Sequence, residues 1–413
     1  MSRRVVITGL GVVAPNGIGV EDFWNNTLQG VSGIKPYGWG AAFGFKSAAS
    51  GQVTDFRPDE SASEAGHSRY VQFALAAARM AVEDAGIDVS GHDPLRVGVS
   101  ISSAIADAAS MEENLKTLTG SGEADVAPDR VRDGFYDSFD FGLAATAIAT
   151  KYGVAGSVSN LSTGCTAGLD ALGYALDQIR SGTADVMIAG ASEAPLCPLS
   201  IGSFEALGAL SSRTVPASEA SCPYTVERDG FVIAEGSGVF VLESYEHAMR
   251  RGAHIYAELA GYASVNNTYH MTDLAPDGAE LACCIRQALD DSGCQPDDVD
   301  HISAHGSSTP QNDINETNAI KSVFNARAYG IPVNSLKAMT GHSLAAANAV
   351  ETVALCLEMR HQKIHPTINY RRPDPQCDLD YVGNQARDSR LRVALKLSSG
   401  FSGIHSVIVL RAI

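Results

Sequence analysis

The sequence predicts an α/β fold built from two similar halves. Apolar runs with strand character alternate with runs at helical spacing along most of the 413 residues. From residue 257 the order of strands and helices recurs, and each half contains a related turn: Thr-Gly-Cys-Thr around Cys165 and Thr-Gly-His-Ser around His342. Each turn follows a strand and opens a helix rich in Ala and Leu. We therefore predict a duplicated unit that places Cys165 and His342 opposite each other across a pseudo-two-fold axis.

The composition excludes several classes of function. Hydrophobic residues make up 45% and charged residues 19% of the chain, which is typical of a globular protein with a large core. A net charge of −17 argues against a general nucleic-acid or membrane-surface binder. No apolar run reaches the roughly 18 residues of a membrane span. The eight cysteines form no C-x-x-C pair, which argues against a zinc or disulfide framework and favours reduced thiols in the cytoplasm.

The N-terminal apolar run is expected to be a strand and a turn. It is short, contains two glycines and ends in Pro-Asn-Gly without a small-x-small cleavage site, unlike a signal peptide. A buried strand is expected over residues 4–8. Residues 9–14 match the dinucleotide pattern G-x-G-x-x-A only formally, because the next helix begins late, near residue 20. We therefore expect a tight loop there and no dinucleotide site.

The remaining elements of the first half follow in order. Residues 31–65 are expected to be irregular, and residues 119–138 and 211–230 to be loops. Residue 86 is a glycine that should cap the helix before it. Helices are expected at 70–86, 105–118 and 141–152, and again after Cys165; strands are expected at 96–101, 154–161 and 184–190, with a hairpin or strand pair at 231–243.

The second half repeats the alternation. Strands are expected at 257–265, 299–304, 332–335 and 394–397, and helices at 278–293, from about 313, and at 344–360.

Cys165 is the first candidate catalytic residue. It lies at a tight turn between a strand and a helix, where free backbone N–H groups and the positive end of the helix dipole favour an anion. A cysteine in this place can have a pKa below the ordinary value of about 8.5 and react as a thiolate. The sequence therefore predicts a nucleophile at the start of this helix.

Three further groups carry chemistry. His305 follows a strand and precedes Gly-Ser-Ser-Thr, which presents an imidazole on an open turn. Lys337 lies five residues before His342. The Gly-rich turn Ser-Ser-Gly-Phe-Ser-Gly over residues 398–403 follows the last expected strand. Together with Cys165 they supply a nucleophile, two imidazoles, a cation and free N–H groups, the parts needed for acyl transfer through a thioester.

The chain resembles the β-ketoacyl-ACP synthases of the condensing-enzyme group almost end to end. The motifs that carry the resemblance are Val-Val-Ile-Thr-Gly near the start, the Cys165 turn, Arg-Asp-Gly-Phe ending at 231, Tyr-His-Met-Thr ending at 272, the His305 turn, Lys337 to His342, and Gly-Phe-Ser-Gly from 400. The wording Ser-Thr-Gly-Cys-Thr-Ala-Gly-Leu-Asp is most similar to the ketosynthase α subunits of type II polyketide synthases. The resemblance implies a thiolase-like fold in αβαβα layers, with halves at residues 1–250 and 251–413.

The resemblance also implies roles in a decarboxylating Claisen condensation. Cys165 would take an acyl chain from acyl carrier protein (ACP), and its backbone N–H and that of Phe401 would form an oxyanion hole. His305 and His342 would hold the malonyl thioester and stabilise the enolate. Lys337 would orient the site through a carboxylate.

Other residues match supporting positions of the family. Glu316 is the carboxylate that matches the partner of the lysine. Ser307 and Thr309 match positions that hydrogen-bond the pantetheine arm, and Thr272 and Gly400 are further candidate substrate-binding residues. The phenyl ring of residue 401 matches a gate at the acyl pocket.

Two positions depart from the family pattern. Ser402 stands where the terminal turn commonly has glycine, so gating is expected to differ. Gly208 stands where many relatives have an arginine used for ACP docking. Arg69 and Arg213 are weaker docking candidates, and we expect both to be solvated surface charges.

The resemblance implies ACP as a partner and a heterodimer with a chain-length factor, with no cofactor other than the phosphopantetheine arm of ACP. The strand before Cys165 would pair across the subunit interface, and residues 119–141 would lie near the partner's pocket. Two alternatives stay open: a homodimeric fatty-acid-elongating synthase, and a non-catalytic structural subunit. A thiolase would need a second cysteine in a Cys-x-Gly context, and His342 disfavours a Cys-His-Asn starter-unit synthase.

Overall fold

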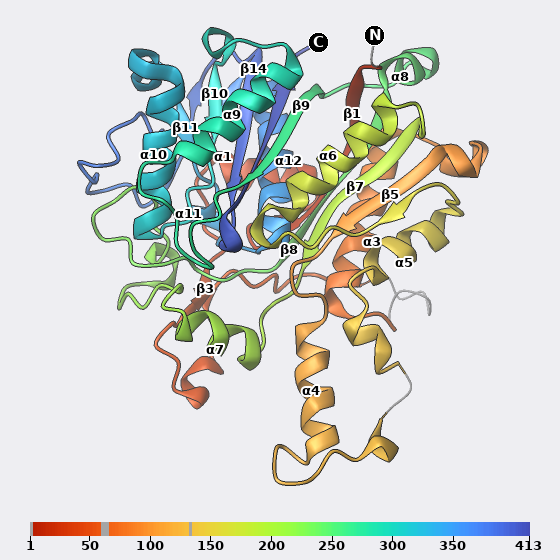
Figure 1. The fold of residues 1–413 in the computed structure, drawn as a ribbon, viewed down its shortest axis with the longest axis vertical. Coiled ribbons are helices and arrows are strands. Elements are labelled where there is room, and N and C mark those ends of the chain that lie inside the picture. Colours follow the sequence, from red (N-terminus) through yellow and green to blue (C-terminus); the bar gives the residue numbers. More distant parts are fainter. Residues whose placement is uncertain (1–2, 59–65, 132–133) are drawn as a thin grey trace.

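A computed structural model of the chain describes residues 3–58, 66–131 and 134–413 (Figure 1). Residues 59–65 of the stretch expected to be irregular, and residues 132–133 of the loop expected at 119–138, lie outside the described residues. Within the described residues, no helix has both the length and the apolar character that a membrane crossing requires.

The helices and strands alternate through both halves of the chain. The helices are α1 Val20–Leu28, α3 Arg69–Ala85, α4 Ala108–Thr119, α5 Leu143–Tyr152, α6 Ala167–Arg180, α7 Pro198–Ala206, α8 Tyr245–Arg251, α9 Ala279–Ser292, α10 Pro310–Phe324, α11 Lys337–Thr340 and α12 Ala345–His361. The strands are β1 Val5–Ala14, β2 Gly17–Ile18, β3 Lys35–Pro36, β4 Ala49–Ser50, β5 Val97–Ser102, β6 Val158–Ser159, β7 Val186–Glu193, β8 Gly236–Ser244, β9 Ala257–Asn266, β10 His301–Ser303, β11 Val333–Asn334, β12 Lys363–Ile364, β13 Arg387–Asp388, β14 Val393–Ser399 and β15 Ile404–Arg411.

The main sheet has the same pairing pattern on either side of its middle. Its strand order is β11-β10-β14-β15-β9-β1-β8-β7-β5-β6, with β2 attached to β1. In each half, two parallel pairings at the outer edge are followed by antiparallel ones toward the centre. The halves meet where β1 pairs antiparallel with β9. The sheet therefore crosses the expected boundary without a break, and the division into residues 1–250 and 251–413 stays a prediction.

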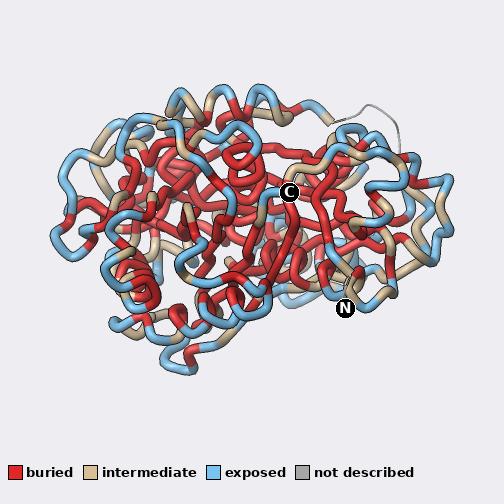
Figure 2. The backbone as a smooth tube through the Cα atoms, turned by 90° about the horizontal axis from the view of Figure 1, so that it is seen from above, coloured by how far each residue is buried: buried red, intermediate tan, exposed pale blue. Residues whose placement is uncertain are grey.

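Helices cover both faces of the sheet and fill the space between its halves. Helices α3 and α5 pack on the outer face of the first half, α9 and α10 lie over the second, and α6 and α12 pack against each other in between (Figure 1). This is the αβαβα layering that the resemblance implied. Buried chain runs through the middle of the molecule and exposed chain lies at its rim (Figure 2).

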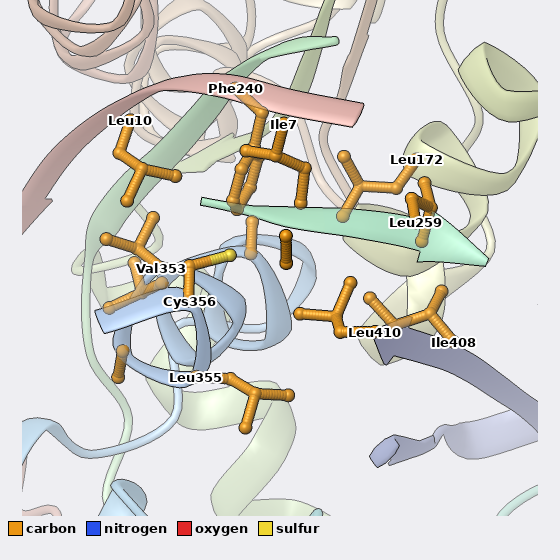
Figure 3. Close-up of a cluster of buried hydrophobic side chains, with 14 of the residues drawn as sticks. Ile7, Leu10, Leu172, Phe240, Leu259, Val353, Leu355, Cys356, Ile408 and Leu410 are labelled. Carbon is orange, nitrogen blue, oxygen red and sulfur yellow. The ribbon is translucent and has the colours of Figure 1, made fainter. Parts of the chain in front are cut away.

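The central core joins the two halves. Figure 3 shows side chains of β1, β8, β9 and β15 meeting those of α6 and α12, among them Ile7, Leu172 and Val353. The helices that carry the two related turns are therefore fixed against one shared apolar layer, which can hold their N-terminal ends in a constant relation.

Residues 9–14 are part of strand β1, so the expected tight loop is wrong. A Cβ added at Gly9 would lie 2.1 Å from the Ala81 carbonyl oxygen, and one at Gly11 would lie 1.9 Å from that of Ala77. The two glycines therefore let helix α3 pack closely against the strand, and they do not form a turn. No dinucleotide-binding turn forms at these residues.

Two other expectations about strands are wrong. Of the apolar run 154–161, only Val158–Ser159 forms a strand, β6, and Val158 is 38% exposed at the edge of the sheet. The stretch 231–243 contains one long strand, β8, and no hairpin. The expected helices at 70–86, 105–118, 141–152, 278–293 and 344–360 are confirmed as α3, α4, α5, α9 and α12, with small shifts at their ends. Strand β15 and the short helix α11 were not expected.

Candidate active site

Cys165 lies at the entrance of helix α6, on a turn that the second half helps to hold. Gly164 has φ 64°, a left-handed conformation that glycine adopts without strain. The carbonyl oxygen of Cys165 accepts hydrogen bonds from Ser398 Oγ at 3.0 Å and Asn348 Nδ2 at 2.5 Å. These donors come from β14 and α12, so the cysteine turn is fixed by the opposite half of the molecule.

Asp170 lies one turn into helix α6 and holds the cysteine turn by hydrogen bonds. Its buried carboxylate accepts hydrogen bonds from the hydroxyls of Thr163 and Thr166, the latter at 2.8 Å. It also accepts from Tyr262 at 2.8 Å and from Ser406 at 2.5 Å, which lie on β9 and β15. A carboxylate with this many donors needs no cation partner to remain buried.

The two predicted histidines meet. Their rings are 5.2 Å apart between centroids and nearly perpendicular, at 81°. His305 follows β10, His342 follows α11, and both are at least 96% buried, with exposed fractions of 4% and 2%. Ser398 Oγ lies 3.5 Å from His305 Nδ1. Among the described residues, Nδ1 of His342 has no hydrogen-bond partner.

The side chain of Lys337 contacts the backbone at His305 and forms an ion pair with a different carboxylate from the expected one. Its ammonium is 2.6 Å from Glu351 Oε1 and donates to the His305 carbonyl oxygen at 2.8 Å. Glu316 instead accepts from the backbone N–H groups of His305 and Gly306, at 2.6 and 3.0 Å. The predicted pairing of Lys337 with Glu316 is therefore wrong, because Glu316 is committed to the backbone of the histidine turn.

A cavity of about 330 Å³ opens onto these side chains. Two of the predicted site residues, Lys337 and Glu316, do not line this cavity. The other predicted residues do: Cys165, Thr272, His305, Ser307, Thr309, His342, Gly400 and Phe401. The structure thus brings together residues from five separate stretches of the sequence. Ser307 and Thr309 lie side by side, with their hydroxyl oxygens 2.9 Å apart.

An aromatic row forms one wall of the site. The ring centroids of Phe401 and Phe204 are 6.4 Å apart. Those of Phe204 and Phe231 are 5.5 Å apart, and those of Phe231 and His342 are 5.0 Å apart. Phe401 is only partly buried and stands at the end of this row. A ring in this place can open or close access to Cys165 by changing rotamer.

Ser402 adopts φ 65°, a left-handed conformation that glycine takes freely and serine does not. Its N–H donates to the Met271 carbonyl at 2.7 Å, and its own carbonyl accepts from Asn266 at 2.7 Å. The turn that carries Phe401 is therefore tied to the loop after β9.

The expected low pKa of Cys165 is wrong for the resting protein. The pKa of the thiol is raised to about 11, chiefly by desolvation, and Glu193 acts in the same direction. Lys337 and the N–H groups of Phe401 and Cys165 favour the thiolate, but their effect is smaller than the cost of burial. Cys165 is thus a thiol at neutral pH, and it must lose its proton to act as a nucleophile.

Burial and nearby cations hold the pKa of both histidines well below the usual range. For His305 and His342 the first cause is desolvation and the next is the charge of Lys337, with Lys396 contributing at both. Both imidazoles are therefore neutral at physiological pH. A neutral imidazole can donate one N–H to an oxygen that gains charge.

The weaker docking candidates are bound within the protein. Arg69 donates to Glu235 at 2.6 Å and to the Val53 carbonyl at 2.7 Å, and Arg213 donates to the Glu219 carbonyl at 2.5 Å. Both expected surface charges therefore have partners within the protein, and 39% of the Arg69 side chain remains exposed. Gly208 lines the cavity, and none of the described residues that line it is an arginine or lysine.

Several residues of the site were not identified from the sequence. Asn348 and Glu351 lie on α12, and Lys396 lies on β14. Asn348 and Glu351 are polar residues inside an apolar helix, and Lys396 stands between buried aliphatic neighbours on a strand. A polar residue in an otherwise apolar element was the available signal, because such residues stay buried only with partners. In the described part of the chain, no group of three or more His, Cys, Asp or Glu residues could hold a metal ion.

Comparison with known proteins matches two family models along the chain. Residues 2–248 match the β-ketoacyl synthase N-terminal domain, and residues 256–371 match the β-ketoacyl synthase C-terminal domain.

Among curated proteins, the tetracenomycin polyketide synthase ketoacyl synthase alpha subunit of Streptomyces glaucescens is 42% identical, with 99% of this chain and 97% of that protein aligned. Among solved structures, this chain resembles AntDE:AntF (apo), a type II PKS acyl-carrier protein in complex with its ketosynthase bound to the hexaketide, with 62% identity, a TM-score of 0.96 and both chains fully covered. The ishigamide ketosynthase/chain length factor follows at 33% identity and a TM-score of 0.91, again with full coverage.

Proposed function

The chain belongs to the β-ketoacyl synthase family, and we propose that it is the catalytic ketosynthase subunit of a type II polyketide synthase. It condenses an acyl group on Cys165 with malonyl-ACP, releasing CO₂ and extending the chain by two carbons. The single observation that carries this proposal is the convergence of Cys165, His305, His342 and Phe401 on one cavity.

Acyl transfer is the first step. Sγ of Cys165 attacks the thioester carbonyl of acyl-ACP, and the bond from that carbon to the pantetheine sulfur breaks. The proton of the Cys165 thiol leaves with the departing pantetheine thiol. The N–H groups of Cys165 and Phe401 face the sulfur and can hold the oxyanion of the tetrahedral intermediate.

Decarboxylation follows at the histidines. The bond between the malonyl carboxylate and the central carbon breaks, CO₂ leaves, and the electron pair becomes a thioester enolate. The neutral imidazoles of His305 and His342 donate hydrogen bonds to the enolate oxygen. The ammonium of Lys337 holds the His305 carbonyl and keeps this imidazole in place.

Condensation completes the cycle. The enolate carbon attacks the acyl carbon on Cys165, the bond to Sγ breaks, and the product leaves as a β-ketoacyl thioester on ACP. The Cys165 thiolate then takes a proton from solvent. Ser307, Thr309 and Thr272 lie along the cavity wall, where their hydroxyls can bind the pantetheine arm. The chemistry requires no cofactor beyond the phosphopantetheine that carries the substrates.

We propose ACP and a chain-length factor as the partners of this chain, on the strength of the two solved relatives. Two surfaces support a large interface. Strand β6 ends the sheet order and carries the exposed Val158. Helix α4 and the segment after it extend away from the body (Figure 1) and expose Leu115, Val126 and Tyr136 at 58%, 65% and 74%. Exposed apolar side chains of this kind mark a subunit contact.

We also propose that the reaction takes place in the cytoplasm. The eight cysteines, all within the described residues, are free thiols, and a catalytic thiol requires a reducing compartment to remain so.

The test is reconstitution. The chain is co-expressed with a candidate chain-length factor and incubated with ACP and a malonyl donor, and intact-mass spectrometry follows Cys165 and the ACP-bound product. We expect an acyl mass on Cys165 and a lengthened chain on ACP. Failure of the wild type to acquire the acyl mass, or equal acylation of Cys165→Ala, would overturn the mechanism.

Purification of the chain alone distinguishes a heterodimer with a chain-length factor from a homodimer. A protein that is insoluble alone and soluble with the chain-length factor supports the heterodimer. A stable and fully active homodimer would instead favour the fatty-acid-elongating alternative. Full product formation by Cys165→Ala would favour the structural subunit.

A further inference from the structure

A second buried lysine lies behind the histidines. Lys396 is on β14, five residues before Phe401, and its side chain is fully buried. Its ammonium donates to the carbonyl oxygens of Ala304 and Leu397, both at 2.8 Å. It also lies 2.7 Å from Glu351 Oε2. A fully buried lysine is costly, so its contacts need an explanation.

Lys396 and Lys337 share one carboxylate. Glu351 is 2.6 Å from Lys337 through Oε1 and 2.7 Å from Lys396 through Oε2. Two ammonium groups therefore face a single carboxylate, and the cluster has an excess of positive charge when both lysines are protonated. We name Lys337, Glu351 and Lys396 the buried cation cluster.

The buried cation cluster holds the backbone on which His305 stands. Lys396 binds the carbonyl of Ala304, and Lys337 binds the carbonyl of His305 itself. Glu316 accepts hydrogen bonds from the backbone N–H groups of His305 and Gly306. The turn is thus fixed by cations at its carbonyls and by a carboxylate at its amides.

The charge of the cluster reaches the imidazoles as well. Lys396 is among the groups that lower the pKa of both His305 and His342, after desolvation and Lys337. The same positive potential would stabilise an enolate, because its charge develops at the imidazoles in a region of low dielectric. Neutral histidines can supply hydrogen bonds, and the lysines behind them supply the charge.

We propose that Lys396 is a positioning residue for the decarboxylation step, acting with Lys337 and Glu351 to hold the His305 turn and to place positive charge behind the two imidazoles. This inference rests on the proposed function, because it assigns a residue to one step of that reaction. Lys396 does not line the cavity, so it acts through the histidines and not on the substrate.

The proposal has a pH signature. The pKa of Lys396 is lowered to about 8, chiefly by burial; Lys337 acts in the same direction, and Glu351 and Glu316 oppose the shift. The titratable groups that face it are thus Glu351 on α12, Lys337 on α11 and Glu316 on α10, besides the histidines it affects. As pH rises through about 8, Lys396 loses its proton and the cluster loses its excess charge. Decarboxylation is expected to slow over this range.

The test compares Lys396→Met with wild type in two assays on the reconstituted complex. One measures acylation of Cys165 by intact mass, and the other measures single-turnover CO₂ release from malonyl-ACP between pH 6.5 and 9.5. At neutral pH we expect decarboxylation to fall at least about tenfold, short of the ~10²–10³ lost with a direct oxyanion donor. Acylation is expected to be nearly unchanged, and the fall above pH 8 to disappear.

A matched control is Lys363→Met, which removes an ammonium on β12 whose side chain is 42% exposed; it should behave as wild type in both assays. Unchanged decarboxylation in Lys396→Met, or a variant that keeps the fall above pH 8, would overturn the inference. Should the variant not fold, the wild-type profile decides, because a rate that does not fall between pH 8 and 9.5 overturns it. No acylation in wild type would instead refute the proposed function.

Discussion

The two related turns share a glycine with positive φ and have different supports. Gly164 and Gly341 precede Cys165 and His342 with φ of 64° and 73°, and each turn opens a helix of the central layer. The cysteine turn is held by neutral donors gathered around Asp170, and it borders the cavity. The His342 turn, which also lines the cavity, joins α11 to α12, and these two helices are bridged by Lys337 and Glu351 of the buried cation cluster.

This difference matches what each turn has to do. A nucleophile must be reached by an acyl chain, so its turn is placed at the cavity and fixed by hydrogen bonds without a strong local charge. In the proposed reaction both histidines stabilise a charge that forms, and the buried cation cluster beside them is a preorganised source of positive potential. Two turns of related sequence thus serve different steps of the proposed reaction, and they differ in the residues that support them.

Removing the shared carboxylate of the buried cation cluster is expected to have the largest effect on stability. Glu351→Ala leaves two buried ammonium groups without their carboxylate, and it should lower the free energy of unfolding by about 3–5 kcal/mol. Urea denaturation followed by circular dichroism measures this change.

Asp170→Asn is the matched change at the cysteine turn. The amide retains one acceptor oxygen for the surrounding hydroxyls, so the expected loss is smaller, about 1–3 kcal/mol. A loss from Asp170→Asn that exceeds the loss from Glu351→Ala would contradict the claim that the two turns are held by different forces.

The pH dependence of alkylation sharpens the comparison at Cys165. With the pKa of the thiol raised to about 11, the thiolate fraction increases with pH throughout the neutral range. Iodoacetamide labelling of Cys165, read by mass spectrometry with Cys165→Ala as background, should therefore accelerate roughly tenfold per pH unit from 7 to 9. A labelling rate that is already constant near pH 7 would instead show that the pKa of Cys165 is low, as its position at the start of the helix alone suggests.

The smallest expected effect concerns the glycine-rich turn over Cys165. Ser402→Gly removes a side chain at φ 65° and should raise the free energy of unfolding by up to about 1 kcal/mol. It should also speed acylation of Cys165, because the turn that carries Phe401 can move more freely. Ser121→Gly, at φ 62° in the loop after α4, is the control. It should give a similar stability gain with no change in acylation, and faster acylation in both variants would contradict a specific gating role of the turn that carries Phe401.

The sequence was sufficient for the residues whose role is carried by a local motif. Cys165, His305, His342 and Phe401 each stand in a short turn with a recognisable pattern, and all four line the cavity. The long amphipathic helices were also predictable, because their periodicity is a property of the segment itself.

What could not be predicted depended on contacts between distant segments. Glu316 and Glu351 are both buried acidic residues on helices, and only the packing decides which one meets Lys337. The pKa of Cys165 depends on how far the site is closed, which outweighs the helix position. Gly9 resembled a loop glycine because the helix that packs against it lies some seventy residues further along the chain.

The most direct test of this division of labour is a pair of variants measured in both half-reactions. Cys165→Ala should take up no acyl group and still release CO₂ from malonyl-ACP. His342→Ala should lose about 10²–10³ in the rate of CO₂ release and still acylate Cys165 at close to the wild-type rate. If His342→Ala slowed acylation as much as decarboxylation, or if Cys165→Ala abolished CO₂ release, the two turns would not act as separate devices and the account would be contradicted.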